Sequence, residues 1–388
     1  MKEKQSKRIL TLIYTICLIS LIVVTAFTGA CAKPVPTPAP APAPKPAPAP
    51  APAPAPTPAP APTPAPAPKP APAPPEVFKF KFSSFHAPGS DNARWIETFG
   101  DMVNKATEGR VELVYYHAQA LGNIGKFTDL VNSGICEMAE IIPPFEPGKF
   151  DIENITGLPF TGIPNRTVGY QVQKELFQNG FFPGLADFKV LHFKTGALNT
   201  LFLRSKKVLT LEDFDGLKLR AADPMILNLF EKLGATPVAI PSPEVYMALD
   251  RGIIDGVSTG HEYLIGTKMY EVTKYCMWQP SLGIGTMVYI MNKEVWNSLP
   301  PDIQDAIDSV SAEFEGWFLG DAEGLDKTAM ETLGGFGMEL YEVSPSETAR
   351  FQEAAVPVVD EWIADMEAKG RSAREAVDLM MEIIGRYQ

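Results

Sequence analysis

The sequence predicts an α/β protein of two lobes that follows a long N-terminal extension. Three observations predict this fold class. After residue 76, segments with the period of a strand alternate with segments with the period of a helix. The stretch from Glu76 to Gln388 holds 313 residues, which is enough for two lobes and too long for one small module. A helical pattern near its end is also longer than a single lobe.

The first elements of this stretch alternate between strand and helix. Phe78, Phe80 and Phe82 alternate with two lysines, which predicts a strand over 77–82. Apolar residues then recur at helical spacing from Ile96, and this helix is expected to stop at Gly109. A strand over 111–116 and a helix over 126–132 follow. Strand, helix, strand, helix is typical of a parallel sheet.

The same alternation continues to the long helix. We expect further strands near 190–192, 218–220, 237–240 and 287–291, and helices over 166–178, 225–232 and 243–250. From Pro301 to about Leu333 the pattern predicts one helix of roughly 30 residues and about 45 Å. Because that length exceeds one lobe, we expect this helix to bridge two.

The residues before Glu76 are predicted to form no folded domain. Twenty-two of the 38 prolines lie between Pro34 and Pro75, where proline alternates almost strictly with alanine. Such a tract lacks apolar periodicity and every second backbone donor, so we expect a disordered linker over 31–75. At about 3.1 Å per residue it would act as a spacer of up to roughly 130 Å. A role as ligand for proline-binding modules is the alternative.

The first 30 residues have the pattern of a secretory signal. Four basic residues lie within Met1–Arg8, an apolar run covers Ile9–Phe27, and small residues precede Cys31. This pattern resembles a bacterial lipoprotein signal, in which the cysteine becomes the lipidated first residue. We therefore predict a signal peptide over 1–30, lipidation of Cys31 and a lipid-anchored, extracytoplasmic protein. The alternatives are ordinary cleavage and an uncleaved membrane helix, since 19 apolar residues can span about 30 Å.

The charge of the folded part excludes two classes of partner. The whole chain carries −12, and removing the seven basic residues and one acid before residue 76 leaves −18. Phosphate backbones and anionic lipid repel such a body, so we predict no nucleic-acid partner. An anionic ligand would need a locally placed cation. Cys136 and Cys276 are predicted to be separately buried thiols, with a disulfide between them left open.

The folded part contains an ordered set of motifs. They are Ala120-Leu-Gly122, Leu158-Pro-Phe160, Leu211-Glu-Asp-Phe-Asp-Gly-Leu-Lys-Leu-Arg220, Leu233-Gly-Ala-Thr-Pro-Val238, Pro243-Glu-Val-Tyr-Met-Ala-Leu249, Gly252-Ile-Ile-Asp-Gly256 and Met291-Asn-Lys-Glu-Val-Trp-Asn-Ser-Leu-Pro-Pro301. In this order they resemble the solute-binding proteins of tripartite ATP-independent periplasmic (TRAP) transporters, a DctP-like family. The resemblance covers nearly all of 76–388.

The resemblance implies a two-lobed periplasmic-binding-protein fold with a hinge and a long lobe-spanning helix. The first lobe is expected to comprise roughly 76–197 and 287–325, and the second roughly 198–286 and 326–388. The implied function is capture of a small organic carboxylate in the cleft between the lobes and its delivery to TRAP permease subunits in the membrane. A ligand-sensing subunit for a signalling partner is the alternative function.

Arg220 is the first candidate for binding the ligand. The resemblance implies that the last residue of the Gly-Leu-Lys-Leu-Arg motif holds the ligand carboxylate, and that residue is Arg220. A guanidinium offers a planar fork of donors that matches a carboxylate in two hydrogen bonds. The alternative role is a structural ion pair with one of the 45 acids of the folded part.

A second candidate region follows Gly256. Relatives often carry a side-chain amide three positions beyond this glycine, and this chain has Thr259 there, with Ser258 and His261 beside it. The change in side chain leaves the identity of the acid open. Alternatively, Ser258 or Thr259 caps the following helix.

Two further pairs complete the candidate site. Asn199 and Thr200 lie about twenty residues before Arg220, where some relatives place a further arginine or asparagine. One basic residue instead of two would favour a monocarboxylate over a dicarboxylate. Phe85 and His86 follow the first strand and are expected to form the opposite wall, since ligands bind beyond the carboxyl ends of strands. A loop without ligand contact is the alternative for this pair.

Enzyme chemistry finds little support. Gly256-Val-Ser-Thr-Gly260 matches a nucleophile elbow, but the only later histidine is His261, too close to Ser258 to follow an intervening acid. The four histidines lack paired spacing, and there is no nucleotide-binding glycine motif. We therefore predict no metal, no cofactor and no enzyme activity. A cation that assists ligand binding and an enzyme of unrecognised type stay open.

Overall fold

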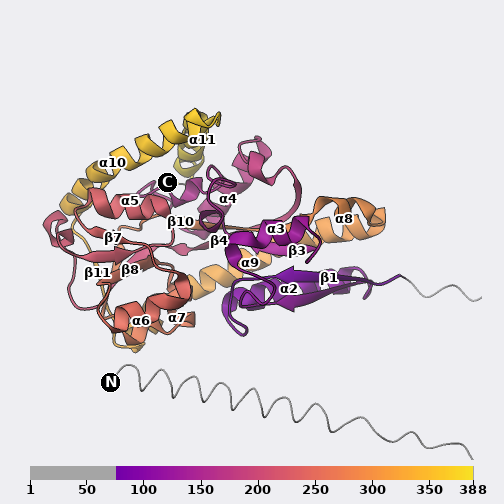
Figure 1. The fold of residues 1–388 in the computed structure, drawn as a ribbon, viewed down its shortest axis with the longest axis horizontal. Coiled ribbons are helices and arrows are strands. Elements are labelled where there is room, and N and C mark those ends of the chain that lie inside the picture. Colours follow the sequence, from indigo (N-terminus) through magenta and orange to yellow (C-terminus); the bar gives the residue numbers. More distant parts are fainter. Residues whose placement is uncertain (1–75, 388) are drawn as a thin grey trace, which may run out of the picture. The chain divides into compact units, whose positions relative to one another are not determined.

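The computed structural model describes residues 76–387, which form a two-lobed α/β fold around two sheets (Figure 1). The predicted signal peptide, Cys31 and the Pro/Ala tract lie outside the described residues. The first sheet has the strand order β2 (Val111–Tyr116), β1 (Phe78–Ser83), β3 (Met138–Ile141), β10 (Ile284–Asn292) and β4 (Phe188–Leu198). The second has the order β11 (Glu339–Glu342), β9 (Tyr275–Gln279), β5 (Thr200–Leu203), β8 (Gly256–Thr259), β6 (Lys218–Arg220) and β7 (Thr236–Val238).

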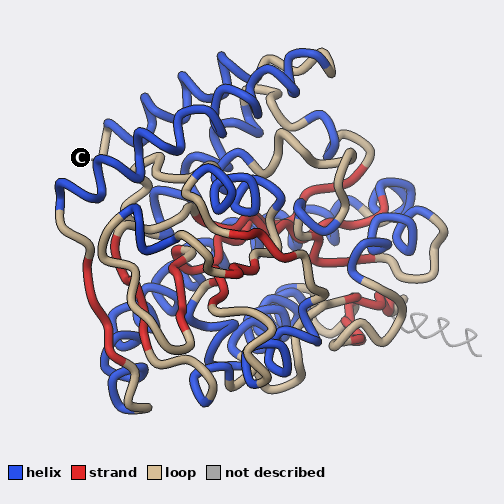
Figure 2. Tube along the Cα trace, turned by 60° about the vertical axis from the view of Figure 1, so that its left-hand side comes forward, coloured by secondary structure: helices blue, strands red, loops and turns tan. Residues whose placement is uncertain are grey.

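Helices flank both sheets, while strands at the sheet edges stay uncovered (Figure 2). The helices of the described residues are α2 (Asp91–Ala106), α3 (Phe127–Asn132), α4 (Arg166–Gln178), α5 (Pro224–Lys232), α6 (Val245–Asp250), α7 (His261–Gly266), α8 (Lys293–Ser298), α9 (Pro301–Gly335), α10 (Pro345–Ala368) and α11 (Ala373–Gly385). The predicted strand of alternating phenylalanines is confirmed as β1, and Phe80 and Phe82 are buried in the core between this sheet, α2 and α9. The predicted helix over 166–178 is also confirmed.

Side-chain caps fix the start of the helices that border the space between the lobes. The Asn165 side chain accepts a hydrogen bond from the backbone of Val168 (3.0 Å) and begins α4. Asp223 accepts one from the backbone of Met225 (2.9 Å) and begins α5. Both are residue types that commonly satisfy the free backbone donors of a first helical turn.

The prediction of a parallel sheet is correct for only part of each sheet. β1 is parallel to β2 and β3, and β6 is parallel to β7 and β8. β10 is antiparallel to β3 and β4, however, and β5 is antiparallel to β8 and β9. The antiparallel strands belong to the segments that pass from one sheet into the other. β4 and β10 were among the predicted strands, but an alternating strand and helix pattern does not fix the direction of a strand that crosses between sheets.

Two crossing segments lie side by side and form the connection between the sheets. The first passes from β4 through Asn199 into β5, and the second passes from β9 through Gly283 into β10. The Asn199 backbone donates to Gly283 O (2.8 Å), and the Leu282 backbone donates to Asn199 O (2.7 Å). These paired crossings are the hinge that the two-lobed fold requires.

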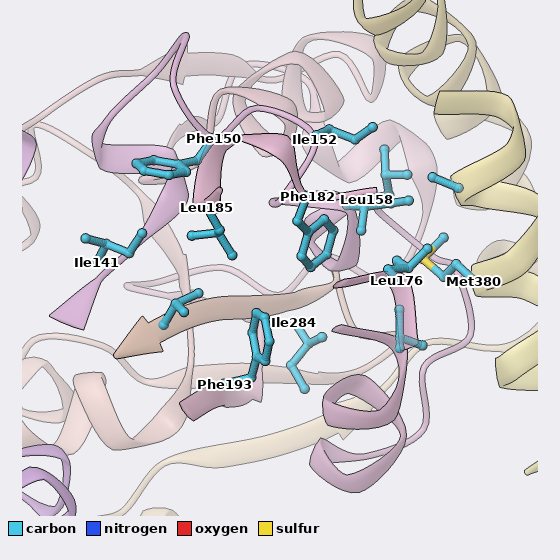
Figure 3. Close-up of a cluster of buried hydrophobic side chains, with 14 of the residues drawn as sticks. Ile141, Phe150, Ile152, Leu158, Leu176, Phe182, Leu185, Phe193, Ile284 and Met380 are labelled. Atoms are coloured by element: carbon cyan, nitrogen blue, oxygen red, sulfur yellow. The ribbon is translucent and has the colours of Figure 1, made fainter. Parts of the chain in front are cut away.

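Helices α9 and α10 also pass between the lobes. Phe314 and Phe318 of α9 lie in the core of the first lobe and Leu333 in that of the second, which confirms the predicted bridging helix. Phe351 of α10 packs in the second lobe. Its last turns and all of α11 pack in the first, where Met380 lies near Leu176 (Figure 3). The assignment of 326–388 to the second lobe is therefore wrong for the end of α10 and for α11.

The two cysteines of the described residues are separately buried free thiols, as predicted. Cys136 lies in a core of the first lobe and Cys276 in one of the second. Burial raises the pKa of each thiol to about 12, so neither forms a reactive thiolate near neutral pH.

Replacing the hinge glycine Gly283 by alanine is expected to destabilise the fold. Its φ is +112°, and a Cβ would lie 2.8 Å from the backbone oxygen of Gly157. Strain of this kind costs roughly 1–3 kcal/mol, and thermal unfolding would report it as a lower melting temperature. Gly285→Ala is the matched control, because its Cβ meets no atom within 4 Å. Equal melting temperatures of the two variants would contradict the prediction.

Candidate functional site

A cavity of about 150 Å³ lies between the two lobes beside the hinge. It is bounded on one side by the segments that follow β1 and β3 and on the other by the segments that follow β6 and β8. Its walls are mostly aromatic and aliphatic, with a few polar side chains among them, which is the usual composition of a small-molecule site. The lining includes Phe85, His86, Phe145, Asn154, Asn199, Arg220, Asp223, Ser242, Ser258, Thr259, Glu262 and Tyr263.

Arg220 is the last residue of β6, and its position at the carboxyl end of the strand brings its guanidinium to the cavity. The side chain is only 3% exposed. Its Nε donates to Ile240 O (3.1 Å) and its Nη2 to Ser242 Oγ (3.0 Å). Within residues 76–387 no carboxylate lies within ion-pair distance of it. Burial lowers the pKa of Arg220, so its positive charge is desolvated without a compensating anion.

The wall from the first lobe ends in a buried charge cluster of His86, Glu140 and Lys194. His86 Nε2 lies 2.7 Å from Glu140 Oε2, and Lys194 forms an ion pair with the same carboxylate. Burial lowers the pKa of His86, although Glu140 opposes this effect. Burial also disfavours the charge of Glu140, but His86 and Lys194 outweigh it and lower its pKa to about 2. The cluster therefore holds His86 in place on the cavity wall.

A hydrogen bond crosses the cleft near the hinge, from Asn154 Nδ2 of the first lobe to Asp223 Oδ2 of the second (2.7 Å). Both side chains line the cavity and both are buried. Burial raises the pKa of Asp223 to about 6, opposed by the hydrogen bonds from Asn154 and from the Met225 backbone. Asp223 is thus an acid on the wall that loses its proton close to neutral pH.

A buried ion-pair network connects the lobes at the hinge. Arg166 at the start of α4 pairs with Glu262 of α7 (2.9 Å) and with Asp326 of α9 (2.7 Å). Glu262 also accepts a hydrogen bond from the Ala197 backbone (3.0 Å). Burial opposes the charge of Glu262, but Arg166 and His261 outweigh it and lower its pKa to about 2. Although Glu262 lines the cavity, its charge is compensated by Arg166.

The structure brings six of the sequence-predicted site residues together around this cavity. They are Phe85, His86, Asn199, Arg220, Ser258 and Thr259. Thr200 and His261, which the structure also describes, lie outside its lining. Thr200 is buried beside the Cys276 thiol (3.8 Å), and His261 faces Asp326 (3.3 Å). Ser258 lies within β8 opposite Leu201, so the matching five-residue motif does not form a strand-to-helix elbow.

Six of the lining residues named above were not predicted from the sequence, namely Phe145, Asn154, Asp223, Ser242, Glu262 and Tyr263. Ser242 and Tyr263 contact the surroundings of Arg220, and Asp223 and Glu262 supply the acids of the wall. Asp223 could have been predicted from the sequence. An aspartate before Pro224 is typical of a helix start, and this helix follows directly after the strand that ends at Arg220. No local pattern marks Ser242 or Tyr263 as a site residue, since only the fold brings their segments close to Arg220.

The described part of the chain offers neither a metal site nor a membrane span. Residues 76–387 contain no cluster of three histidine, cysteine, aspartate or glutamate side chains arranged to hold a metal ion. None of the helices described is long and apolar enough to cross a bilayer.

Comparison with known proteins identifies relatives across nearly the whole described part. Residues 82–365 match the family described as bacterial extracellular solute-binding protein, family 7. The chain is 28% identical over 308 residues to the C4-dicarboxylate-binding periplasmic protein DctP of Rhodobacter capsulatus, covering 76% of this chain and 90% of the relative. It is 26% identical over 220 residues to the 2,3-diketo-L-gulonate-binding periplasmic protein YiaO of Escherichia coli, covering 55% and 66%.

Solved structures of TRAP solute-binding proteins share the fold. One from Rhodoferax ferrireducens, in complex with copurified benzoate, has a TM-score of 0.74 and 25% identity, covering 80% of this chain and 98% of that one. Another, from Bordetella bronchiseptica with bound (R)- and (S)-mandelate, has a TM-score of 0.72 and 23% identity, covering 80% and 100%.

Proposed function

Because the chain belongs to bacterial extracellular solute-binding protein family 7, whose relatives include TRAP solute-binding proteins, we propose that its cavity captures a compact monocarboxylate with an apolar body. The family comprises transport proteins and is not a class of enzymes. TRAP solute-binding proteins deliver their ligands to membrane permease subunits. In this proposal the protein releases its ligand unchanged to such a permease, and the comparisons favour this role over a sensory one.

The observation that carries the proposal is the uncompensated guanidinium of Arg220. It is buried at the cavity, and no acid within residues 76–387 pairs with it. Leaving a charge buried without a partner is costly, so an anionic ligand group would supply what the protein does not. A carboxylate fits because its two oxygens match the planar donor fork of arginine.

The rest of the cavity supports one carboxylate and an apolar body. Arg220 is the single lysine or arginine among the described lining residues, whereas an ionised Asp223 would repel a second carboxylate. Phe85, Phe145 and Tyr263 supply aromatic walls. An apolar cavity of about 150 Å³ is large enough to hold a benzene ring. The benzoate and mandelate complexes of structural relatives support an aromatic acid as the first choice.

Calorimetric titration with matched acids tests the ligand class. We expect benzoate, 3-hydroxybenzoate or mandelate to bind with a Kd near the micromolar range, about −8 kcal/mol. Succinate represents the C4-dicarboxylates of the Rhodobacter capsulatus relative and should bind at least about tenfold more weakly, because no second cation receives its other carboxylate. Tighter binding of succinate than of every monocarboxylate would refute the proposed class.

The affinity for such an acid is expected to rise as the pH falls through about 6. Asp223 is ionised above its raised pKa and neutral below it, so lower pH removes one negative charge from the wall that receives the anion. Glu262, whose pKa is lowered to about 2, stays ionised over this range. Titrations between pH 5 and 8, where a carboxylate ligand stays ionised, should show a several-fold change.

Asp223→Asn is the control for this pH dependence, because asparagine also caps a helix well. We expect the variant to bind with nearly constant affinity over the same range. A wild-type profile that persists in the variant would exclude Asp223 as the titrating group.

We also propose that the mature protein is lipid-anchored at Cys31, which lies outside the described residues. The support is the basic segment, apolar run and small residues that precede this cysteine. Metabolic labelling with a fatty acid should mark the wild type, while Cys31→Ser should lose the label and leave the membrane fraction. Cys17→Ser is the matched control, and equal labelling of wild type and Cys31→Ser would contradict the assignment.

A further inference from the structure

Two aromatic rings from opposite lobes stack against each other at the cavity. Phe85 follows β1 in the first lobe, and Tyr263 belongs to α7 beside the second sheet. Their ring centroids are 5.9 Å apart, and the ring planes differ by 19°. Phe145 supports Phe85 from the first lobe at a centroid distance of 5.7 Å. Offset stacking at this separation is a favourable contact, so the pair holds the lobes together at this point.

The stacked pair is also a wall between two cavities. The cavity that contains Arg220, here called the inner cavity, adjoins a second one of about 250 Å³, here called the outer cavity. The two share part of their lining, namely Phe85, His86, Asn92, Glu262 and Tyr263. The outer cavity is otherwise bounded by polar or small groups that include Ser90, Gln119 and Thr267. Separation of Phe85 from Tyr263 would therefore open a direct path between the two cavities.

Tyr263 is connected to the anion-binding arginine through Ser242. Arg220 donates to Ser242 Oγ (3.0 Å), and Ser242 and Tyr263 line the same cavity. Burial raises the pKa of Tyr263, opposed by Ser242 and by the positive charge of Arg220. The guanidinium thus holds a side chain that lines the cavity together with the ring that stacks on Phe85.

We propose that Phe85 and Tyr263 form an aromatic gate that sets the rates of ligand entry and release, and that Ser242 links this gate to Arg220. The inference rests on the proposed binding of a carboxylate at Arg220. A bound carboxylate fixes the guanidinium, which holds Ser242 and Tyr263 and keeps the stack closed. Tyr263 is in this sense a positioning residue for retention of the ligand.

Stopped-flow exchange of benzoate, with the full chain, tests the gate. Phe85→Leu and Tyr263→Leu keep apolar bulk but remove the stack, and each should speed both entry and release about tenfold, so that the Kd changes much less than the rates. Phe336→Leu is the matched control, because it removes the Tyr270–Phe336 stack (4.0 Å, 13°), which lies outside both cavities. Exchange rates equal to the wild type in both gate variants would overturn the proposal.

The proposed link between the aromatic gate and Arg220 predicts a separate change in the release rate. Tyr263→Phe keeps the ring but removes the hydroxyl, so release should become about threefold faster while entry stays unchanged. Ser242→Ala should give the same change, and the double variant no more than either alone, because all three interrupt one chain of contacts. If the release rate of the double variant rose by the product of the two single effects, the two groups would act independently, and this result would overturn the link.

A measurement without ligand separates failure of the gate from failure of the proposed function. Phe85→Cys combined with Tyr263→Cys should be joined in high yield by a short bifunctional thiol reagent, whereas Phe85→Cys with Phe336→Cys should not. The native thiols Cys136 and Cys276 are buried and should not react. If no carboxylate binds the wild type but the gate pair is joined, the proposed function fails alone. Equal, low yields for both pairs would overturn the gate, as would rapid ligand exchange in the joined protein.

Discussion

Arg220→Ala is expected to raise the Kd for a bound monocarboxylate such as benzoate at least about 100-fold. The ligand carboxylate would lose a bidentate, charge-assisted partner in a desolvated cavity, and such a loss costs about 3 kcal/mol. No other lysine or arginine lines the cavity within the described residues, so nothing nearby can take over the contact. Isothermal calorimetry with benzoate measures the effect directly.

Two further measurements test whether the loss of affinity is due to the guanidinium of Arg220. Arg220→Lys keeps the charge but not the planar fork, so it should restore only part of the affinity. In the absence of added acid, Arg220→Ala should melt no lower than the wild type, since it removes a buried charge that lacks an ionic partner. Calorimetric binding that is the same in Arg220→Ala and wild type would exclude this residue as the anion site.

Lys194→Met is expected to lower the free energy of unfolding by about 3–5 kcal/mol, because it leaves Glu140 buried with only His86 as a partner. Lys194 and Glu140 are both fully buried, and Lys194 Nζ also donates to Asn92 Oδ1 (2.8 Å). The melting temperature should fall by roughly 10 °C. Lys189→Met, which breaks a partly exposed ion pair with Asp308, should cost about 1 kcal/mol or less.

Removing both charges should be milder than removing one. Lys194→Met combined with Glu140→Leu leaves no unpaired ion, so part of the lost stability should return. The pH dependence gives an independent check. Because the pKa of Glu140 in the fold is about 2, below its ordinary value of 4.5, its stabilising contribution is present above pH 4.5 and lost as the pH falls toward 2. A double variant less stable than Lys194→Met, with unchanged acid unfolding, would contradict this account.

Local sequence patterns were sufficient to predict those helices and strands that bury one whole face. The phenylalanine alternation of β1 and the helical spacing of α4 and α9 were read correctly, because burial of one face imposes a period. Short strands such as β5 and β8 were not predicted. Their four residues are held by neighbours from distant segments, as in the pairing of Leu201 with Ser258 and Met277. Four residues carry too little periodicity to be recognised alone.

The residues of the candidate site also divide into those that a local motif predicts and those that only the fold brings together. Arg220 and Thr259 were selected from motifs continuous in sequence, and both line the cavity. Tyr263 and Ser242 were missed because their relation to Arg220 exists only in the folded protein. His261 was selected for its closeness in sequence to Thr259, but its position at the first turn of α7 turns it toward Asp326.

The core around α11 has a consequence for the order in which the protein can fold. That core joins residues from Ile124 to Ile384, so the first lobe to be synthesised cannot complete its packing until almost the last residue is available. Contacts of such long sequence separation are slow to form. A nascent chain that lacks α11 cannot complete this core, so packing of the first lobe must follow synthesis of α11.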